Sequence, residues 1–213
     1  MVMRSPVLNV MANAALKAAR GLIRDFGEVE HLQVSVKGPG KFVSSADLKA
    51  ERLLKTELNR ARPGYGLLFE EGGEERGTDQ RHRWIVDPLD GTTNFLHGIP
   101  HFAISIALER DGEIVAGLVY EPTRDEMYSA EKGLGAYVND RRLRVSARRQ
   151  LGAAVIGTGM PDGPHADNPA YRAILPTVTA ATSGIRRMGA AALDLAYVAA
   201  GRLDGFGEFG LAP

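Results

Sequence analysis

The sequence contains no cysteine, no apolar run long enough to cross a membrane and no excess of charge of either sign. The absence of cysteine excludes disulfides, thiolate nucleophiles and cysteine-ligated zinc or iron–sulfur centres. The 26 basic and 26 acidic side chains balance, which favours neither a nucleic-acid nor a membrane-surface partner but does not exclude a local basic patch. We therefore expect a cytoplasmic protein that has no membrane segment and no direct nucleic-acid contact.

The 213 residues, 44% of them hydrophobic, are sufficient for a sizeable core, and neither an internal repeat nor an interdomain linker is evident. Apolar spacings of three and four predict a helix from Leu8 to Phe26 and a second from Ser44 to Arg62. The glycines and proline of residues 37–41 predict a flexible loop, and the charged residues 74–83 predict another. Strands are predicted at 65–69, 84–86, 102–108, 114–120, 127–130, 136–138, 142–145, 153–158, 185–188 and 203–209, and later helices at 169–181 and 191–200.

The order of these predicted elements indicates the fold class. Helices come first, mostly antiparallel strands follow, and helices and strands alternate at the end. Asp111-Gly112 supports the antiparallel part, because this dipeptide is typical of a two-residue hairpin turn. The sequence therefore predicts layered helices and a mixed sheet (α/β, of the α+β kind), not a doubly wound parallel fold.

The stretch from Trp84 to Phe95 carries the strongest chemical signal. Three large apolar residues are followed by Asp87 and Asp90, with Pro88 between them. Because proline has no backbone N–H, we expect the chain to leave the sheet between the two aspartates. Residues 91–94 have the small, polar composition of a helix start, where free N–H groups attract an anion. Carboxylates for a cation beside N–H groups for an anion indicate a metal-assisted phosphate site, although a simple Pro-x-Asp-Gly turn is the alternative.

A second acidic strand end, Glu70-Glu71, favours convergence of carboxylates. Two carboxylates about 4 Å apart repel by about 4 kcal/mol at an effective dielectric of about 20, so such a cluster needs a cation or shifted pKa values. Oxygen ligands suit Mg²⁺, Mn²⁺ or Ca²⁺, and a neighbouring phosphate favours Mg²⁺. Simpler interpretations stay open: a solvated loop at Glu70-Glu71, a capping box from Ser44 to Asp47, and an N-cap at Thr92.

These motifs together identify a resemblance. Residues 84–95 resemble the signature of the inositol monophosphatase family, which consists of magnesium-dependent, lithium-sensitive sugar phosphatases. Residues 43–47 resemble the family's Val-Thr-x-x-Asp helix start, and Glu70-Glu71 resembles its Gly-Glu-Glu strand end. Residues 189–194 and 204–208 resemble its later substrate-side motifs. The similarity covers essentially the whole chain and is closest to bacterial members.

The resemblance implies an α-β-α-β-α layered sandwich with mixed, largely antiparallel sheets, and a homodimer. Residues 1–213 would form one domain, with 1–145 as the metal- and phosphate-binding half and 146–213 as the start of the substrate-side half. The implied activity is hydrolysis of myo-inositol monophosphate, or a similar small sugar or polyol phosphate, by metal-activated water without a phospho-enzyme. Two or three Mg²⁺ ions are implied, with Mn²⁺ as a substitute and Li⁺ as an inhibitor.

Roles follow from the resemblance residue by residue. The first metal would be bound by Glu70, Asp87 and the Leu89 carbonyl, and the second by Asp87 and Asp90. The catalytic residues would be Thr92, which orients the attacking water, with Asp47 and Glu70 in support. The substrate would be contacted by Asp90, Gly91, Thr92, Gly189, Ala190, Ala191 and Glu208. Lys37 lies where the family has a mobile active-site loop.

Four departures from the family pattern are visible. Phe69 replaces a glycine, Ala190 replaces a serine or threonine, and Gly207 replaces an aromatic residue. The sequence also reaches Pro213 before the Trp-Asp motif whose aspartate ligates the second metal in the family. We expect this sequence to be an incomplete record of a longer protein and, as it stands, to bind the second metal weakly and turn over slowly.

Two kinds of alternative stay open. The substrate could instead be histidinol phosphate, fructose 1,6-bisphosphate, NADP or a 3′-phosphonucleotide. The protein could instead be a catalytically weak member that joins bacterial transcription antitermination complexes with RNA polymerase. Arg148-Arg149 and Arg186-Arg187 would then be candidate contacts.

Overall fold

The computed structural model describes residues 5–29, 34–38, 41–160 and 168–211. The amino-terminal elements are α1 (Pro6–Gly27), β1 (Val34–Gly38), β2 (Lys41–Ser44), α2 (Ser45–Ala61), β3 (Tyr65–Phe69), β4 (Gly73–Glu75), β5 (Asp79–Asp90) and α3 (Thr92–Leu96). The middle elements are β6 (Ala103–Arg110), β7 (Glu113–Glu121), β8 (Glu126–Glu131), β9 (Gly135–Val138) and β10 (Arg141–Arg142). The last elements are a 3₁₀ turn (Leu151–Ala153), β11 (Val155–Thr158), α4 (Pro169–Ala181), β12 (Gly184–Arg186), α5 (Ala191–Ala199) and β13 (Gly205–Gly207). None of the helices in these ranges has the length and apolar character that a membrane crossing requires.

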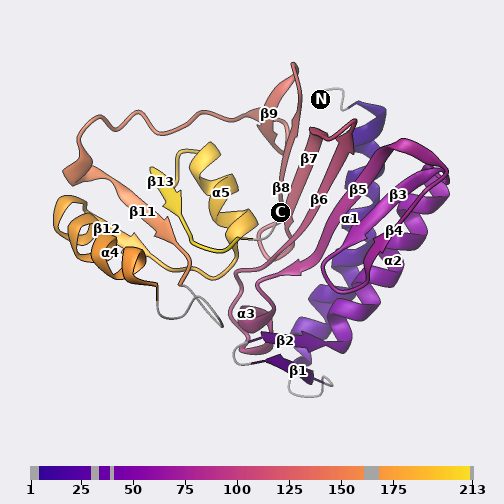
Figure 1. The fold of residues 1–213 in the computed structure, drawn as a ribbon, viewed down its shortest axis with the longest axis horizontal. Helices are drawn as coiled ribbons and strands as arrows, with labels where there is room; N and C mark the ends of the chain where they lie inside the picture. The colour runs from indigo at the N-terminus through magenta and orange to yellow at the C-terminus, as the bar shows by residue number, and fades with distance from the viewer. Residues whose placement is uncertain (1–4, 30–33, 39–40, 161–167, 212–213) are drawn as a thin grey trace.

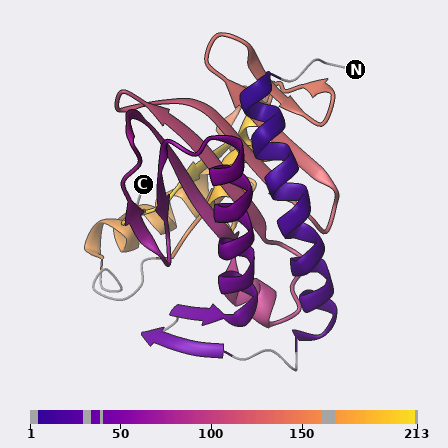
Figure 2. The same cartoon turned by 90° about the vertical axis from the view of Figure 1, so that its right-hand side faces the viewer.

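The large sheet forms the centre of the molecule. Its strand order is β10-β9-β8-β7-β6-β5-β3-β4, and every pair is antiparallel except β3 with β5. Helices α1 and α2 cover one face, as Figure 2 shows. The main core fills this interface, because alternate residues of the strands point to the same face; it includes Trp84, Val86, Ile104, Ile106, Leu118, Leu54 and Met11.

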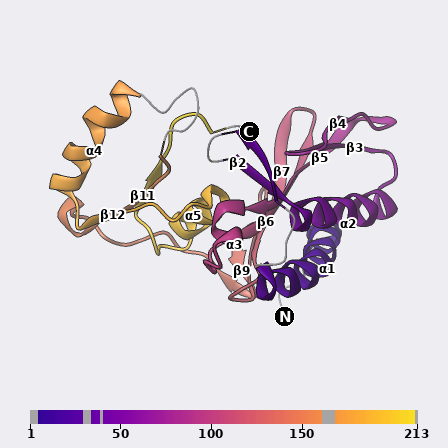
Figure 3. The ribbon, with the colours of Figure 1, turned by 90° about the horizontal axis from the view of Figure 1, so that it is seen from below.

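The remaining elements complete the layers. Helix α5 packs between the large sheet and a small sheet of order β12-β11-β13, and α4 lies on the outer side of the small sheet (Figures 1 and 3). The second core cluster lies at α5 and includes Leu193, Tyr197, Leu203 and Tyr128. The α-β-α-β-α order and the mixed, largely antiparallel large sheet are thus confirmed, whereas the small sheet is parallel throughout its three described strands.

Two predicted loops are partly strands. The prediction of a loop over residues 74–83 was wrong at β4 and at the start of β5, because cross-strand ion pairs stabilise these charged strands; Arg83 contacts Glu74 and Glu109 at 3.0 and 2.9 Å. The prediction of a loop over residues 37–41 was wrong for its ends, because β1 and β2 pair as an antiparallel hairpin. Residues 39–40 lie outside the described residues.

The predicted exit from the sheet at Pro88 was also wrong. Strand β5 continues to Asp90, and its pairing with β6 shifts between Asp87, opposite Ser105, and Asp90, opposite Ala103. Three residue steps on β5 therefore face two on β6, which is the geometry of a bulge. The bulge accommodates Pro88, which has no N–H to donate to the ladder, and keeps both aspartates at the carboxyl end of β5.

Candidate functional site

The topology brings two acidic strand ends together. Strands β3 and β5 are parallel neighbours, with Phe69 opposite Val86. Their next residues, Glu70 and Asp87, therefore emerge from the same end of the sheet, and Glu70 N donates to the Val86 carbonyl at 3.3 Å. The predicted convergence of the two acidic motifs thus follows directly from this parallel pairing.

A cavity of about 490 Å³ lies at this end of the sheet. Its lining includes the predicted site residues Glu70, Asp87, Leu89, Asp90, Gly91, Thr92, Gly189, Ala190, Ala191 and Glu208. Two predicted residues are not part of the lining. Asp47 lies behind Thr92, and Lys37 has its backbone in β1 while its side chain lies outside the described part of the structure. The role of Lys37 therefore stays a prediction.

The carboxylates of the cavity perturb one another. Burial, followed by the negative charges of Asp90 and Glu70, raises the pKa of Asp87 well above its ordinary value. Burial also raises the pKa of Asp90 to about 6, and nearby Asp194 and Glu70 act in the same direction. The Ala192 N–H donates to Asp90 Oδ2 at 2.8 Å and partly offsets this rise. The cavity is therefore an electrostatically unfavourable place for several carboxylates at neutral pH.

These residues fit a hard divalent cation by donor type. The donors available at the cavity are the carboxylate oxygens of Glu70, Asp87 and Asp90 and the carbonyl oxygen of Leu89. A cation would relieve the repulsion that raises the pKa values of the two aspartates. In the described ranges, however, no three acidic or histidine side chains already surround a single point closely enough to hold an ion. The chemical fit therefore rests on the donor set and its charge.

Thr92 and Asp47 form a fixed pair beside the carboxylates. Thr92 Oγ1 lies 2.9 Å from Asp47 Oδ1 and 3.1 Å from the Leu89 carbonyl oxygen. Asp47 is buried, and its Oδ2 accepts from Ser44 N at 2.9 Å and from the Ser44 hydroxyl. Ser44 and Asp47 form a capping box at the start of α2, the alternative that the sequence left open. Asp47 is thus both a helix cap and the partner of Thr92, and the two roles are compatible.

Gly91 provides the turn that starts α3. Its φ is +95°, a conformation that side chains other than glycine rarely adopt. A Cβ atom at this position would lie 3.0 Å from the His101 carbonyl oxygen and 3.3 Å from Ala190 Cβ. The glycine is therefore needed for this backbone conformation and for the close approach of Ala190. Ala190 belongs to the second wall of the cavity, formed by residues from 187–194 and Glu208, whereas Glu70 and residues from 87–93 form the first wall.

Sequence reasoning missed Asn94, His101 and Asp194, which join the two walls. Asn94 Nδ2 donates to the carbonyl oxygens of His101 and Met188, both at 2.7 Å. His101 Nε2 lies 3.3 Å from Oδ1 of the buried Asp194, which lines the cavity. The amide of Asn94 within the signature stretch was the available signal, but its two acceptors are far away in the sequence.

Replacing Asn94 with alanine should remove both bridges and leave the part-buried carbonyl oxygens of His101 and Met188 without this donor. We expect a loss of about 2–3 kcal/mol in unfolding free energy, measured by denaturant titration. Thr93→Ala is the matched control, because Thr93 is the exposed neighbour in α3 and should change stability by less than about 0.5 kcal/mol. Equal stability of the two variants would contradict the bridging role of Asn94.

The carboxyl-terminal wall depends on a second close approach. A Cβ atom on Gly159 would overlap the Glu208 carboxylate, with the nearest atom at 1.8 Å. Gly159 thus gives Glu208 room to lie in the cavity lining. Arg187, which the sequence offered as a candidate partner contact, also belongs to this lining.

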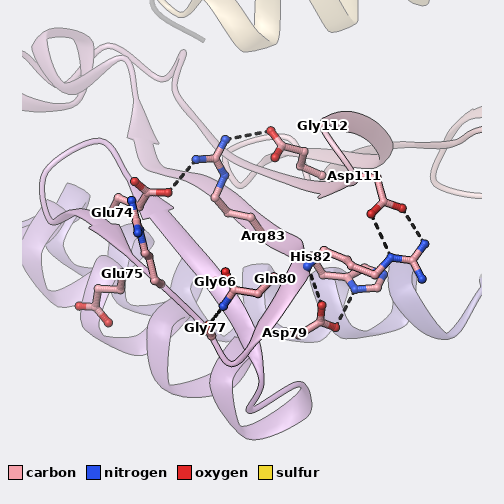
Figure 4. Close-up of a pocket in the computed structure, with 13 residues that line it drawn as sticks. Gly66, Glu74, Glu75, Gly77, Asp79, Gln80, His82, Arg83, Asp111 and Gly112 are labelled. Carbon is pink, nitrogen blue, oxygen red and sulfur yellow. Dashed lines mark hydrogen bonds and ion pairs between the residues drawn. The ribbon is translucent and has the colours of Figure 1, made fainter.

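A second polar cavity, of about 320 Å³, lies around the start of β5 (Figure 4). Its central cations are paired with acids: Arg81 with Asp111 at 2.7 Å, and Arg83 with Glu74 and Glu109. His82 Nδ1 lies 2.8 Å from Asp79 Oδ2, and its ring stacks on Tyr65. The charged residues of this cavity therefore form a surface ion-pair network that joins β4, β5 and the β6–β7 hairpin.

Comparison with known proteins agrees with the geometry. A model described as the inositol monophosphatase family matches residues 3–213. The inositol-1-monophosphatase of Rhizobium meliloti is 63% identical over 209 residues, which cover 98% of this chain and 79% of that protein. The Nus factor SuhB of Pseudomonas aeruginosa is 43% identical, covering 97% of this chain and 78% of that protein. The crystal structure of extragenic suppressor protein SuhB from Bartonella henselae has a TM-score of 0.94 at 61% identity, covering 97% of this chain and 80% of that chain.

Proposed function

The chain belongs to the inositol monophosphatase family, and we propose that it is a metal-dependent phosphomonoesterase acting on myo-inositol monophosphate or a similar small polyol phosphate. Members of this family are generally metal-dependent. The observation that carries the proposal is the single cavity in which Glu70, Asp87 and Asp90 meet the Gly91–Thr92 turn. A homodimer and a cytoplasmic location, both expected from the sequence, belong to this proposal.

The metal-binding residues follow from the donor set. Glu70, Asp87 and the Leu89 carbonyl would hold one Mg²⁺, and Asp87 with Asp90 would hold another. When bound, the ions supply positive charge that lowers the pKa of a coordinated water and stabilises the phosphoryl oxygens. The raised pKa values of Asp87 and Asp90 support this assignment, because a cation would favour their ionised forms.

Thr92 would orient the attacking water. Its single hydroxyl proton has an acceptor in Asp47 Oδ1 at 2.9 Å, since Asp47 Oδ2 is already engaged by Ser44. With that proton directed to Asp47, the lone pairs of Thr92 Oγ1 are free to accept a hydrogen bond from water. The water would then keep an oxygen lone pair for in-line attack on phosphorus, and Glu70 lies across the same cavity as a second acceptor.

The remaining residues would recognise the ester. The backbone N–H groups of Gly91 and Thr92 would donate to phosphate oxygens. The Gly189–Ala191 turn and Glu208 would face the alcohol, because they form the opposite wall of the cavity. A carboxylate at that wall suits hydroxyl donors of a polyol. Ala190 offers no hydroxyl of its own, so contacts to the alcohol would come from backbone groups, Glu208 and the neighbouring lining residues Arg187 and Asp194.

A phosphate-release screen tests the proposal and the choice of substrate. The panel should contain myo-inositol monophosphate, histidinol phosphate, fructose 1,6-bisphosphate, NADP and a 3′-phosphonucleotide, each with and without Mg²⁺ and Li⁺. We expect Mg²⁺-dependent, Li⁺-inhibited release that is fastest with the inositol ester. Release that is equally fast without a divalent cation would contradict the metal assignment, and preference for another ester would replace the substrate.

A second candidate function is favoured by relatives named Nus factor SuhB, including the Pseudomonas aeruginosa protein. In that case the chain would join a transcription complex, with exposed Arg148-Arg149 and Arg186 among its contacts. A pull-down from bacterial extract that recovers no RNA polymerase, together with Mg²⁺-dependent turnover in the screen, would remove this candidate.

A further inference from the structure

The charges of the chain are separated along the sequence. Residues 141–213 contain nine arginines, no lysine and five acidic residues, which gives a net charge of +4. Residues 1–140 contain 17 basic and 21 acidic residues, which gives −4. The overall balance, which disfavoured a nucleic-acid partner, therefore conceals a basic region.

Five of the nine arginines lie in one short stretch, residues 141–149, here called the arginine segment. The segment begins at β10, the outermost strand of the large sheet beside β9. Figure 1 shows the chain crossing from the β9 edge of the large sheet to the small sheet. Its backbone is fixed at several points: Leu143 N donates to the Ala136 carbonyl at 2.8 Å, and Arg148 N donates to Ser146 Oγ at 3.1 Å. The segment therefore presents its side chains from an ordered backbone.

Gly201 shows how closely this backbone is packed. The glycine follows α5, has a φ of +72°, and an added Cβ would lie 2.9 Å from Ser146 N and 3.0 Å from the Arg144 carbonyl oxygen. The middle of the arginine segment is thus seated against the carboxyl end of α5. The amino end of α5, at Ala191, lines the candidate site. Nine residues at about 1.5 Å each separate the two places, so a ligand on the segment would not occupy the cavity.

The guanidinium groups of the segment are mostly unpaired. Arg141, Arg142, Arg144 and Arg149 are exposed, and none has a carboxylate partner in the part of the chain that the structure describes. Within the described ranges, Arg148 is the one arginine of the segment that approaches a carboxylate, with its Nε 3.4 Å from Asp204 Oδ2. Elsewhere, exposed cations are commonly paired, as in Lys17–Glu57, Lys49–Asp25, Lys55–Glu75, Arg60–Glu57, Arg81–Asp111 and Lys132–Glu113.

The composition of the segment favours a phosphodiester ligand. Guanidinium groups bind phosphate oxygens through two parallel N–H bonds, and every cation here is arginine. In an extended chain, side chains two residues apart are separated by about 6.6 Å and form a row that one strand of phosphates can follow. The segment carries no aromatic side chain on which a base could stack, so recognition of the base sequence is not expected.

We propose that the arginine segment binds the phosphate backbone of single-stranded nucleic acid, without preference for base sequence and independently of the phosphatase site.

Fluorescence anisotropy with a labelled oligouridylate tests this proposal over a series of salt concentrations, using the full chain. The test variant carries Arg142→Gln, Arg144→Gln and Arg149→Gln. Each phosphate contact contributes about 0.7 to the slope of log affinity against log salt, so the slope should fall by about 2. The matched control carries Arg20→Gln, Arg52→Gln and Arg76→Gln, which removes three exposed arginines that have no carboxylate partner among the described residues, and it should leave the slope unchanged.

Two further ligands distinguish a nucleic-acid backbone from other polymers. An oligomer with the same bases on an uncharged backbone should not bind, and polyglutamate should bind much more weakly than the oligouridylate. Polyglutamate binding as tight as RNA binding would assign the segment to an acidic protein surface and overturn the proposal. Equal slopes for the test and control variants would also overturn it. Because the readout is binding, failure of the proposed phosphatase activity would not affect the result.

Discussion

Replacement of Asp90 with asparagine is expected to lower metal-dependent phosphate release by at least about 100- to 1,000-fold while increasing the stability of the metal-free protein. The activity falls because an uncharged amide is a poor ligand for a hard cation. The stability rises because the variant removes one charge from the buried cluster formed with Asp87 and Glu70. Phosphate release and thermal unfolding in the presence of a chelator measure the two effects.

The stabilising effect of Asp90→Asn should also depend on pH. The pKa of Asp90 is about 6 in the folded, metal-free protein, against about 3.9 in the unfolded chain. The folded state therefore gains from protonation: stability from this group is present below about pH 4 and is lost as the pH rises to about 6. The loss is on the order of 2–3 kcal/mol, and Asp90→Asn should flatten the profile over this range.

Asp111→Asn is the matched control. Asp111 is exposed, lies in the hairpin turn at a φ of 55°, which asparagine tolerates, and is paired with Arg81 rather than with other carboxylates. Its substitution should leave phosphate release unchanged. If Asp90→Asn retained metal-dependent hydrolysis, or if it destabilised the chelator-treated protein, the assignment of Asp90 to a metal-binding carboxylate cluster would be wrong. Asp87→Asn should likewise abolish hydrolysis while leaving the fold intact.

Gly91→Ala is expected to have the second largest effect. Alanine at a φ of +95° costs about 1–2 kcal/mol, and its Cβ would press against the His101 carbonyl oxygen and Ala190. We expect about 2–4 kcal/mol of destabilisation, or roughly 5–10 °C in Tm, and a fall in activity because the two cavity walls must separate. Thermal unfolding and phosphate release of the same preparation measure both.

Gly98→Ala separates the backbone cost of alanine at a positive φ from the cost of the contact between the added Cβ and its neighbours. Gly98 also has a positive φ, +67°, but an added Cβ would meet no atom within 4 Å. Its substitution should therefore show only the backbone cost of about 1 kcal/mol and leave activity unchanged. Equal losses of stability in the Gly91 and Gly98 variants would mean that the contact between the cavity walls is unimportant.

Local patterns were sufficient to predict much of the fold. The periodicity of α1, the capping box at Ser44 and the Asp111-Gly112 turn each depend on residues close in sequence, and the structure has all three. The acidic ends at Glu70 and Asp87 were also visible locally. Local patterns made it plausible that Glu70 and Asp87 lie close together but could not establish it, because their proximity depends on the parallel pairing of β3 with β5.

The features that were missed depend on distant contacts. Asn94 bonds to the Met188 carbonyl, 94 residues away, and His101 approaches Asp194, 93 residues away. Strand β4 pairs with β3 through its backbone, and its Glu74 contacts Arg83 of β5; hydrophobic periodicity detects neither feature. The bulge at Pro88 depends on the register with β6, so the sequence indicated an interruption but not its form.

The cavity at the ends of β3 and β5 is proposed as a metal-dependent phosphatase site. The most direct test is the rate of phosphate release from myo-inositol monophosphate by a preparation whose intact mass is 22.9 kDa, with Mg²⁺ and with a chelator, beside Asp90→Asn and Asp111→Asn. We predict release that requires Mg²⁺, is lost in Asp90→Asn and is retained in Asp111→Asn. Release that persists in the chelator, or that survives in Asp90→Asn, would show that this cavity is not a metal-dependent phosphatase site.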